Sequence, residues 1–196
     1  MSVIEAFLQE VDAAWRQPGP TIPLRIIGST ALMLQTSYDR GTKDSDILET
    51  DELTYPIAAR LIEIAGPDTA IHKRRGLYVD IVRRGIPFRR QTPVCVPLEQ
   101  LNAKLQHFEV SAMSVVDVVV GKLARFIAND RSDIDAMIAR ELAAHDEVVS
   151  CFQEAIDFKM GLTSDEFARH LRNLHTVERD MFDVAETELK EPSWVR

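Results

Sequence analysis

Apolar and polar residues alternate along this chain with two different periods. Between residues 2 and 16 the apolar side chains recur at helical spacing, and Ser2 with Glu5 matches a capping box, which predicts an amphipathic helix. Short runs of β-favouring residues predict strands at 24–27, 44–48, 77–83, 94–96 and 108–112. After residue 114 the pattern is almost entirely helical. The order of elements predicts an α/β fold (α+β) with a mixed sheet, followed by a helical layer or bundle.

Caps and breakers predict where the other helices begin and end. Asp51 is placed to cap a helix that ends near residue 65, and residues 129–132 are expected to interrupt the helical pattern. Arg75-Gly76 separates two short runs, which predicts a hairpin of 69–74 with 77–83. The remaining predicted helices are 28–35, 98–106, 114–127, 133–143, 146–160 and 164–189. We therefore expect a catalytic α/β domain in residues 1–97 and a mainly helical region, residues 98–196, packed on it.

The composition narrows the class of protein. With 45% hydrophobic and 28% charged residues among 196, the chain has the make-up of an ordinary soluble globular protein. It has no apolar run long enough to span a bilayer and no start that resembles a signal peptide, so we expect no membrane association and a cytoplasmic location. Cys95 and Cys151 stand far apart without metal-ligand spacing, which favours free thiols over a disulfide.

The charge is unevenly distributed. A net charge of −8 argues against a general nucleic-acid binder. Between His72 and Arg90, however, Asp80 is accompanied by seven cationic residues: Lys73, Arg74, Arg75, Arg83, Arg84, Arg89 and Arg90. This basic run would suit a triphosphate or an RNA backbone, and it would equally suit a solvated sheet edge that is protected by charge.

Gly28 and Ser29 stand where the first strand gives way to helix formers. A glycine there lets the backbone approach a ligand closely, and the N–H groups at a helix start attract anions. A glycine followed by a hydroxyl cap is also common in structural turns. Together with Thr30, the pair predicts a phosphate-binding turn only if a second feature supports it.

Three aspartates supply that second feature. Asp44 and Asp46 alternate in one predicted strand, so their carboxylates share a face, with Cα atoms about 6.6 to 6.8 Å apart. They would repel by about 2 to 3 kcal/mol without cations, and so placed they can share two divalent ions. Asp80 lies in the middle of an apolar strand, where a carboxylate needs a partner. The pattern predicts a phosphate-binding turn followed by a site for divalent metal ions.

These motifs resemble a known signature. Gly-Ser, a loop of fourteen residues, then Asp-x-Asp followed by an apolar residue is similar to the polymerase-β-like nucleotidyltransferase superfamily. Gly28-Ser29-Thr30-Ala31-Leu32 with Arg40-x-Thr42-Lys43-Asp44-x-Asp46 more closely resembles the bacterial branch of AbiEii-type toxins and their uncharacterised, DUF6036-like relatives. Ser45 departs from the superfamily pattern, in which an apolar residue commonly separates the aspartates.

The resemblance implies roles for residues outside the Asp-x-Asp strand. Asp80 is placed as the third carboxylate, and Lys122 with Arg125 resembles a helical Lys and nearby Arg of the toxin branch. Asp133 and Asp135 resemble a later Asp-rich run, although acids in the first turn of a helix also stabilise it by roughly 0.3 to 1 kcal/mol. Lys122 could instead pack its stem and place its ammonium group in solvent.

The expected activity follows from the resemblance. The chain would move a nucleoside monophosphate from an NTP to a hydroxyl, with Asp44 and Asp46 holding two Mg²⁺ ions and Asp80 completing the second metal site or acting as the base. Arg40 and Thr42 would contact phosphate or ribose, or merely shape the start of the strand. The implied acceptor is the 3′ end of a tRNA or a protein side chain, and the implied partner is an antitoxin. The alternative is a catalytically inert module with the same fold that binds nucleotide, RNA or protein.

Overall fold

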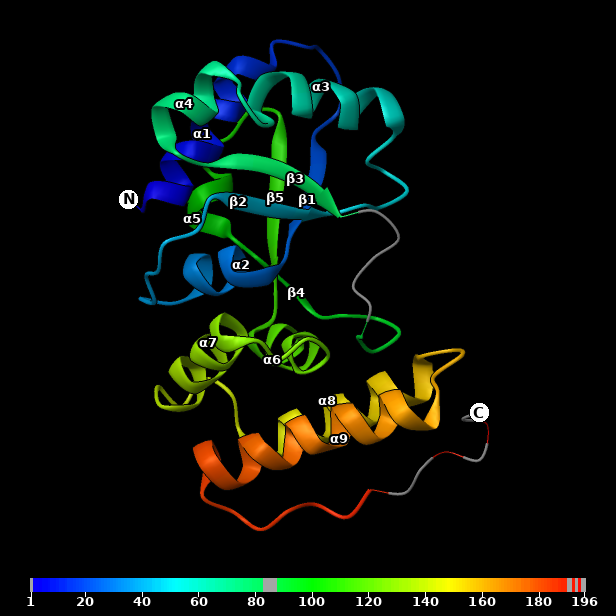
Figure 1. Ribbon diagram of the computed structural model, residues 1–196. Helices are drawn as coiled ribbons and strands as arrows, with labels where there is room; N and C mark the ends of the chain where they lie inside the picture. The colour runs from blue at the N-terminus through cyan, green and yellow to red at the C-terminus, as the bar shows by residue number, and fades with distance from the viewer. Residues whose placement is uncertain (1, 83–87, 190–191, 193, 195–196) are drawn as a thin grey trace. The chain divides into compact units, whose positions relative to one another are not determined.

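The chain folds into two compact units (Figure 1). A computed structural model describes residues 2–82, 88–189, 192 and 194. The first unit comprises Met1–Gly85 with Cys95–Ser114, and the second comprises Ile86–Val94 with Val115–Arg196. The α/β unit therefore extends past residue 97, where the sequence analysis placed the domain boundary, because its sheet needs a strand that follows that position.

The first unit contains a mixed sheet. Among the described residues the sheet has five strands in the order β3-β2-β1-β5-β4, which confirms the predicted α/β class. The strands are β1 (Ile22–Ile26), β2 (Asp44–Leu48), β3 (Tyr78–Val82), β4 (Cys95–Pro97) and β5 (Phe108–Met113). β1 is antiparallel to β2 and parallel to β5, and β2 is parallel to β3. The helices of this unit are α1 (Val3–Trp15), α2 (Gly28–Gln35), α3 (Tyr55–Ala65), α4 (Ala70–Arg75) and α5 (Glu99–Asn102).

Helix α1, at the start of the sequence, is bound to the start of β5, the last strand of this unit. Its predicted capping box is confirmed, with the Ser2 hydroxyl accepting from the Glu5 amide and the Glu5 carboxylate accepting from the Ser2 amide. Its apolar face is buried. On the same face the buried Asp12 carboxylate accepts from the backbone N–H groups of residues 106, 107 and 108 at 2.8–3.2 Å. These bonds fix α1 against the start of β5.

The predicted hairpin around Gly76 is wrong. Residues 70–75 form α4, whose N-cap Thr69 accepts from the His72 amide, and β3 pairs with β2 in parallel rather than with a neighbouring strand. Gly76 has φ +71° and ends the helix. A left-handed glycine serves both helix ends and hairpin turns, so the sequence pattern could not separate the two. Figure 1 shows α1, α3 and α4 grouped on one side of β2 and β3.

Two helix starts also differ from prediction. α3 begins at Tyr55 after Thr54, so Asp51 does not cap it. In the second unit α7 begins at Ala128, so it includes residues 129–132, which were expected to interrupt the helices. Its Asp130 carboxylate accepts from the Ile127 amide at 3.3 Å, and this supplies a cap that the sequence analysis missed.

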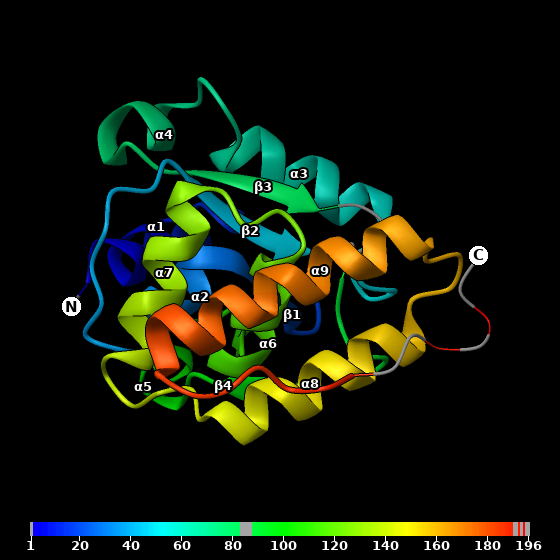
Figure 2. The same ribbon diagram turned by 60° about the horizontal axis from the view of Figure 1, so that its bottom comes forward.

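The second unit is helical. α6 (Val115–Leu123) packs against α7 (Ala128–Ile138), α8 (His145–Phe158) and α9 (Ser164–Val177), as Figure 2 shows. α6 ends four residues before the predicted residue 127. α9 ends at Val177 rather than near residue 189 and continues into a π-helix, η1 (Glu178–Phe182). The core of this unit includes Val119, Leu123, Ile134, Met137, Phe152 and Leu174. In the part of the chain that the structure describes, no helix has the length and apolar character needed to cross a membrane.

Candidate active site

Strands β2 and β3 bring the three predicted carboxylates to one face of the sheet. In their parallel register Asp46 is the partner of Asp80, and Asp44 is the partner of Tyr78. Paired residues of neighbouring strands project to the same side, and residues two apart in a strand share that side. Asp44 and Asp46 are half-buried and Asp80 is exposed, whereas Ser45 and Val79 are buried on the opposite side. We call the side of Asp44, Asp46 and Asp80 the carboxylate face.

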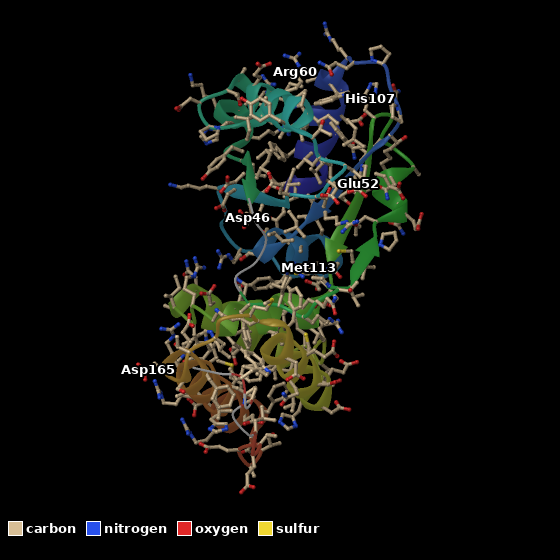
Figure 3. The ribbon with its side chains drawn as sticks, turned by 90° about the vertical axis from the view of Figure 1, so that its right-hand side faces the viewer. Asp46, Glu52, Arg60, His107, Met113 and Asp165 are labelled. Carbon is tan, nitrogen blue, oxygen red and sulfur yellow. The ribbon has the colours of Figure 1, made fainter. Side chains whose placement is uncertain are left out.

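The turn after β1 lies directly against this face. Gly28 has φ +65°, and a Cβ atom on it would lie only 2.8 Å from Asp46 Oδ2 (Figure 3 labels Asp46). The backbone N–H of Ile27 donates to the carbonyl of Asp46 at 2.9 Å. Ile27 is the N-cap of α2 and has no side chain that can cap the helix. The start of α2, with its anion-attracting amides, therefore lies beside a carboxylate.

Two threonines fix the position of Asp44. The buried Thr30 hydroxyl donates to the Asp44 carbonyl at 3.0 Å, and Thr42 Oγ1 donates to Asp44 Oδ1 at 2.9 Å. Thr42 thus has the strand-shaping role that was one of its two predicted roles, and it also orients the carboxylate. Because the Thr30 hydroxyl donates its proton to Asp44, Thr30 can contribute only its backbone N–H to a phosphate-binding turn. Arg40 lies half-buried in the loop before β2, and its contact with a nucleotide stays a prediction.

Tyr78 is a candidate site residue that the sequence analysis missed. Burial first, and then the negative charges of Asp44, Asp80 and Asp46, raise the pKa of its phenol above the usual value, so all three carboxylates lie near it. The signal was present in the sequence, because Tyr78 stands two residues before Asp80 in the same strand. It was overlooked because only ionised side chains were followed along that strand.

The carboxylates do not by themselves form a closed metal site. Among the described residues, no group of three or more His, Cys, Asp or Glu side chains is arranged to hold a metal ion. This fits Mg²⁺, which in proteins commonly binds one or two carboxylates and completes its octahedron with water and substrate phosphates. Asp44 and Asp46 supply the hard oxygen ligands that Mg²⁺ and Mn²⁺ prefer, next to a turn suited to phosphate.

Lys122, Arg125, Asp133 and Asp135 belong to the second unit. Lys122 Nζ lies 2.7 Å from Asp133 Oδ2 and 3.2 Å from Asp130 Oδ1, and both aspartates are buried. Asp135 is exposed on α7. Lys122 thus forms ion pairs with buried aspartates of its own unit, which the sequence analysis did not predict, and a role of these residues in catalysis stays a prediction.

Asp130 is the member of that cluster that the sequence analysis did not single out. Arg125 binds it with two parallel bonds, from Nε at 2.8 Å and Nη2 at 2.9 Å. Burial acts to raise the pKa of Asp130, but the hydrogen bond from Arg125 and the charge of Lys122 outweigh it, so the pKa is lowered. Because Arg125 lies beyond the end of α6, the cluster depends on the turn that leads into α7.

The described residues of the basic run are divided between the two units. Arg74 and Arg75 on α4 both pair with Glu10 of α1, which lowers the pKa of that carboxyl. Arg90 belongs to the second unit, where it binds the buried Asp117 through Nε at 2.8 Å and Nη2 at 2.7 Å. Arg83 and Arg84 lie outside the described residues. Of the five described cations of this run, Arg74 and Arg75 are used in structural ion pairs, and Arg89 and Arg90 belong to the second unit.

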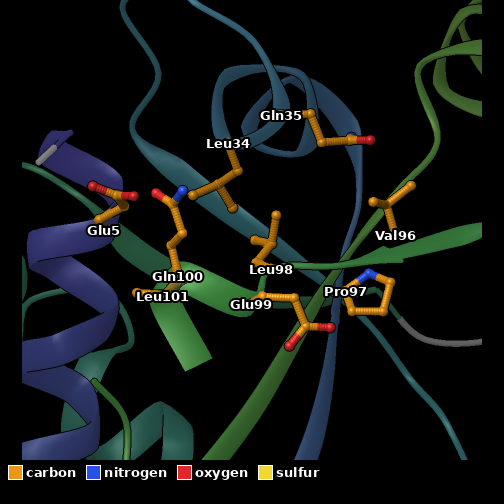
Figure 4. A pocket seen from close by; sticks show the side chains of 9 residues that line it. All are labelled: Glu5, Leu34, Gln35, Val96, Pro97, Leu98, Glu99, Gln100 and Leu101. Carbon is orange, nitrogen blue, oxygen red and sulfur yellow. The ribbon is translucent and has the colours of Figure 1, made fainter. Parts of the chain in front are cut away.

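A cavity of about 390 Å³ lies elsewhere in the first unit (Figure 4). It is lined by residues of α1, the end of α2, β4 and α5: Glu5, Leu34, Gln35, Val96, Pro97, Leu98, Glu99, Gln100 and Leu101. None of the predicted site residues lines it. The carboxylate face remains the place where the predicted chemistry is gathered.

The comparisons with known proteins give a match to a protein family. A family model described as "Nucleotidyltransferase of unknown function (DUF6036)" matches residues 6–186, which include the carboxylate face and nearly all of the second unit. None of the curated proteins matches the chain, and none of the solved structures does. The match leaves the resemblance to AbiEii-type toxins untested.

Proposed function

Because this chain belongs to the DUF6036 family of nucleotidyltransferases, we propose that it transfers a nucleoside monophosphate from an NTP to an acceptor hydroxyl and releases pyrophosphate. The observation that carries the proposal is the contact of the Gly28 turn with Asp46, on a face that also bears Asp44 and Asp80. Such a turn binds phosphates, and such carboxylates bind the cations that phosphates bring. The turn that would bind phosphate and the Asp46 carboxylate that would bind the cation therefore lie side by side.

The chain's own residues would mainly position the reactants. The first-turn amides of α2, from Gly28 to Thr30, would bind the β- and γ-phosphates, and Thr42 would keep the Asp44 carboxylate turned toward the same face. Asp44 and Asp46 are the residues that would hold Mg²⁺. When bound, the cation would neutralise phosphate charge and lower the pKa of the attacking hydroxyl.

The reaction balances without a further reactant. The acceptor oxygen attacks the α-phosphorus, the bond from that phosphorus to the bridging oxygen of the β-phosphate breaks, and pyrophosphate leaves. The proton of the acceptor hydroxyl passes to Asp80, which is exposed on the carboxylate face. Positioning and electrostatic stabilisation supply most of the catalysis in phosphoryl transfer.

The finer identity of the reaction comes from the resemblance alone. The acceptor is the 3′ end of a tRNA or a hydroxyl of a protein, and the physiological setting is a toxin that an antitoxin protein restrains. By the same resemblance, Lys122 with Arg40 would neutralise the charge that grows in the transition state, and Arg125 would bind the nucleotide. The alternative function is a nucleotide- or RNA-binding module that catalyses nothing.

Transfer of label tests the proposal. The purified chain is incubated with each α-labelled NTP, with Mg²⁺ or Mn²⁺, and with total RNA or total protein from a bacterial lysate. We expect label in one acceptor class with the wild type and with Asp51→Asn, a control at an exposed carboxylate in the turn after β2. Asp46→Asn should lower the rate at least about a hundredfold, because a metal ligand is lost. Equal labelling by Asp46→Asn, or none by a folded wild type, would favour the inert module.

A further inference from the structure

Tyr78 and His72 form an aromatic pair on the side of the carboxylate face that lies across β2 from the Gly28 turn. Gly28 follows β1, which flanks β2 on one side, whereas Tyr78 and Asp80 belong to β3, which flanks β2 on the other. β3 is an edge strand of the sheet. Among the described residues no strand lies beyond β3, and Tyr78 is half-buried.

This arrangement offers one side of β2 to the leaving group and the other side to the acceptor of a transfer reaction, an inference that rests on the proposed function. The attacking and leaving oxygens lie roughly in line across the transferred phosphorus. If the leaving pyrophosphate is held at the Gly28 turn, the acceptor must approach from the side of β3. Tyr78 is the aromatic side chain on that side, and it neighbours both Asp44 across the strands and Asp80 along its own strand.

The ring of Tyr78 is supported from α4. His72 packs edge-on against it, with ring centroids 5.1 Å apart and an interplanar angle of 73°. His72 is itself fixed, because its Nδ1 accepts from the backbone N–H of Asp68 at 3.0 Å. The next residue, Lys73, is exposed on the same helix. Proteins hold unpaired bases by stacking them on aromatic rings, and they hold the phosphates of the strand with cationic side chains.

We propose that Tyr78, braced by His72, stacks the terminal base of a single-stranded RNA acceptor and so positions that nucleotide's ribose hydroxyl toward Asp80. Tyr78 is a positioning residue in this scheme, and it takes no proton. The ring rather than the phenol oxygen carries the role, so Phe should replace Tyr and an aliphatic residue should not. The inference selects RNA over protein as the acceptor class, because an amino-acid side chain offers no base for the ring.

Binding measured without transfer tests this inference separately from the proposed function. A fluorescently labelled single-stranded RNA of about ten nucleotides, within the usual site size, is titrated by anisotropy into Asp46→Asn protein. A second RNA is identical except that its terminal ribose carries no base. We expect the base-bearing RNA to bind about tenfold to a hundredfold more tightly than the abasic RNA, which is the usual effect of one stacked base.

Variants of Tyr78 then test whether this residue causes the preference for the base-bearing RNA. Tyr78→Phe should keep the preference for the base-bearing RNA, and Tyr78→Leu should abolish it by weakening only the base-bearing complex. If Tyr78→Leu weakens both RNAs equally, or neither, stacking on Tyr78 is wrong. The abasic comparison on unaltered Tyr78 tests the proposal even if the Leu variant fails to fold.

The two proposals fail in different ways. Absence of label in every acceptor would remove the transferase but would leave Tyr78-dependent RNA binding intact. Label that appears in protein only, with no preference for the base-bearing RNA, would overturn the role of Tyr78 and retain the transferase.

Discussion

At the scale of single residues, the site depends on a close approach that only glycine allows. The α-carbon of Gly28 lies so near the Asp46 carboxylate that a methyl group would meet an oxygen at 2.8 Å. Real Cβ atoms essentially never make such a contact, so Asp46 would have to move. The position also has φ +65°, where L-residues pay about 1 to 2 kcal/mol.

Gly28→Ala should therefore lower label transfer by more than its loss of stability explains. Gly76→Ala is the matched control, because Gly76 has φ +71° and no atom within 4 Å of its added Cβ. Both variants should lower the free energy of unfolding by about 1 to 2 kcal/mol, measured by urea denaturation. Only Gly28→Ala should lower label transfer, by tenfold or more, when both are assayed well below their melting temperatures. Equal transfer by the two variants would show that the contact with Asp46 has no functional weight.

The shared face of Asp44 and Asp46 could be predicted from the sequence because strand geometry is local. A period of two places Asp44 and Asp46 on one face whatever the rest of the chain does. The partners of Lys122 were harder to foresee, because they depend on where α7 begins. Asp130 caps that helix and binds Lys122 and Arg125 at once, so a tertiary contact sets the helix start. Local pattern carries no information on such a contact.

At the scale of elements, the sequence predicted most strands and misjudged the connection between two of them. β2 and β5 begin where expected, and α2 has its predicted bounds. The segment of α4 was taken for a strand of a hairpin, and this error changed the pairing of β3 from parallel to antiparallel. Pairing is a long-range property, and six residues with a capping Thr and a final Gly were too few to establish the helix.

Helix α9 carries a histidine whose environment makes this element sensitive to pH. His170 is buried against Phe88, with ring centroids 4.7 Å apart, and neither ring nitrogen has a hydrogen-bond partner among the described residues. Burial first, and then the charges of Lys159 and Arg169, lower the pKa of His170 to about 4, while Glu166 acts in the opposite direction. The ring is therefore neutral in the native state at pH 7.

Acid should weaken the chain through this residue. A histidine in the unfolded chain has a pKa near 6.5, so between pH 6.5 and 4 the unfolded state binds a proton that the native state does not. Stability is complete above pH 6.5 and falls as the pH falls, by about 3 kcal/mol across the window. His170→Leu should remove this component, measured as the difference in unfolding free energy from wild type at pH 7 and at pH 4.5. A difference that does not change with pH would contradict the assignment.

At the scale of the whole molecule, a net charge of −8 makes the gathering of Asp44, Asp46 and Asp80 on one face costly in the absence of ligand. The chain retains this repulsion in a place where a nucleotide and its cation would relieve it. Functional sites commonly trade stability for binding in this manner. Nucleotide and cation should therefore raise the stability of the folded chain, and this change can be measured without knowledge of the acceptor.

Melting temperatures should show that signature. NTP with Mg²⁺ at a hundred times the dissociation constant should stabilise the wild type by about 2.7 kcal/mol. The double variant Asp44→Asn with Asp46→Asn should be more stable than wild type without ligand, by about 1 kcal/mol, and should gain nothing from the nucleotide. Asp51→Asn serves again as the control and should respond as wild type does. A double variant that still gains stability from NTP with Mg²⁺ would place the nucleotide elsewhere.

The parallel pairing of β2 with β3 also determines where the chain can tolerate a change in length. Residues added within the connection through α3 and α4 leave the alignment of Asp46 with Asp80 unchanged, because a long crossover can absorb them. A single residue inserted between Tyr78 and Asp80 would turn Asp80 toward the buried side and bring an apolar neighbour into its place. Insertions and deletions in related sequences should therefore collect in α3, α4 and their turns and be absent from β2 and β3.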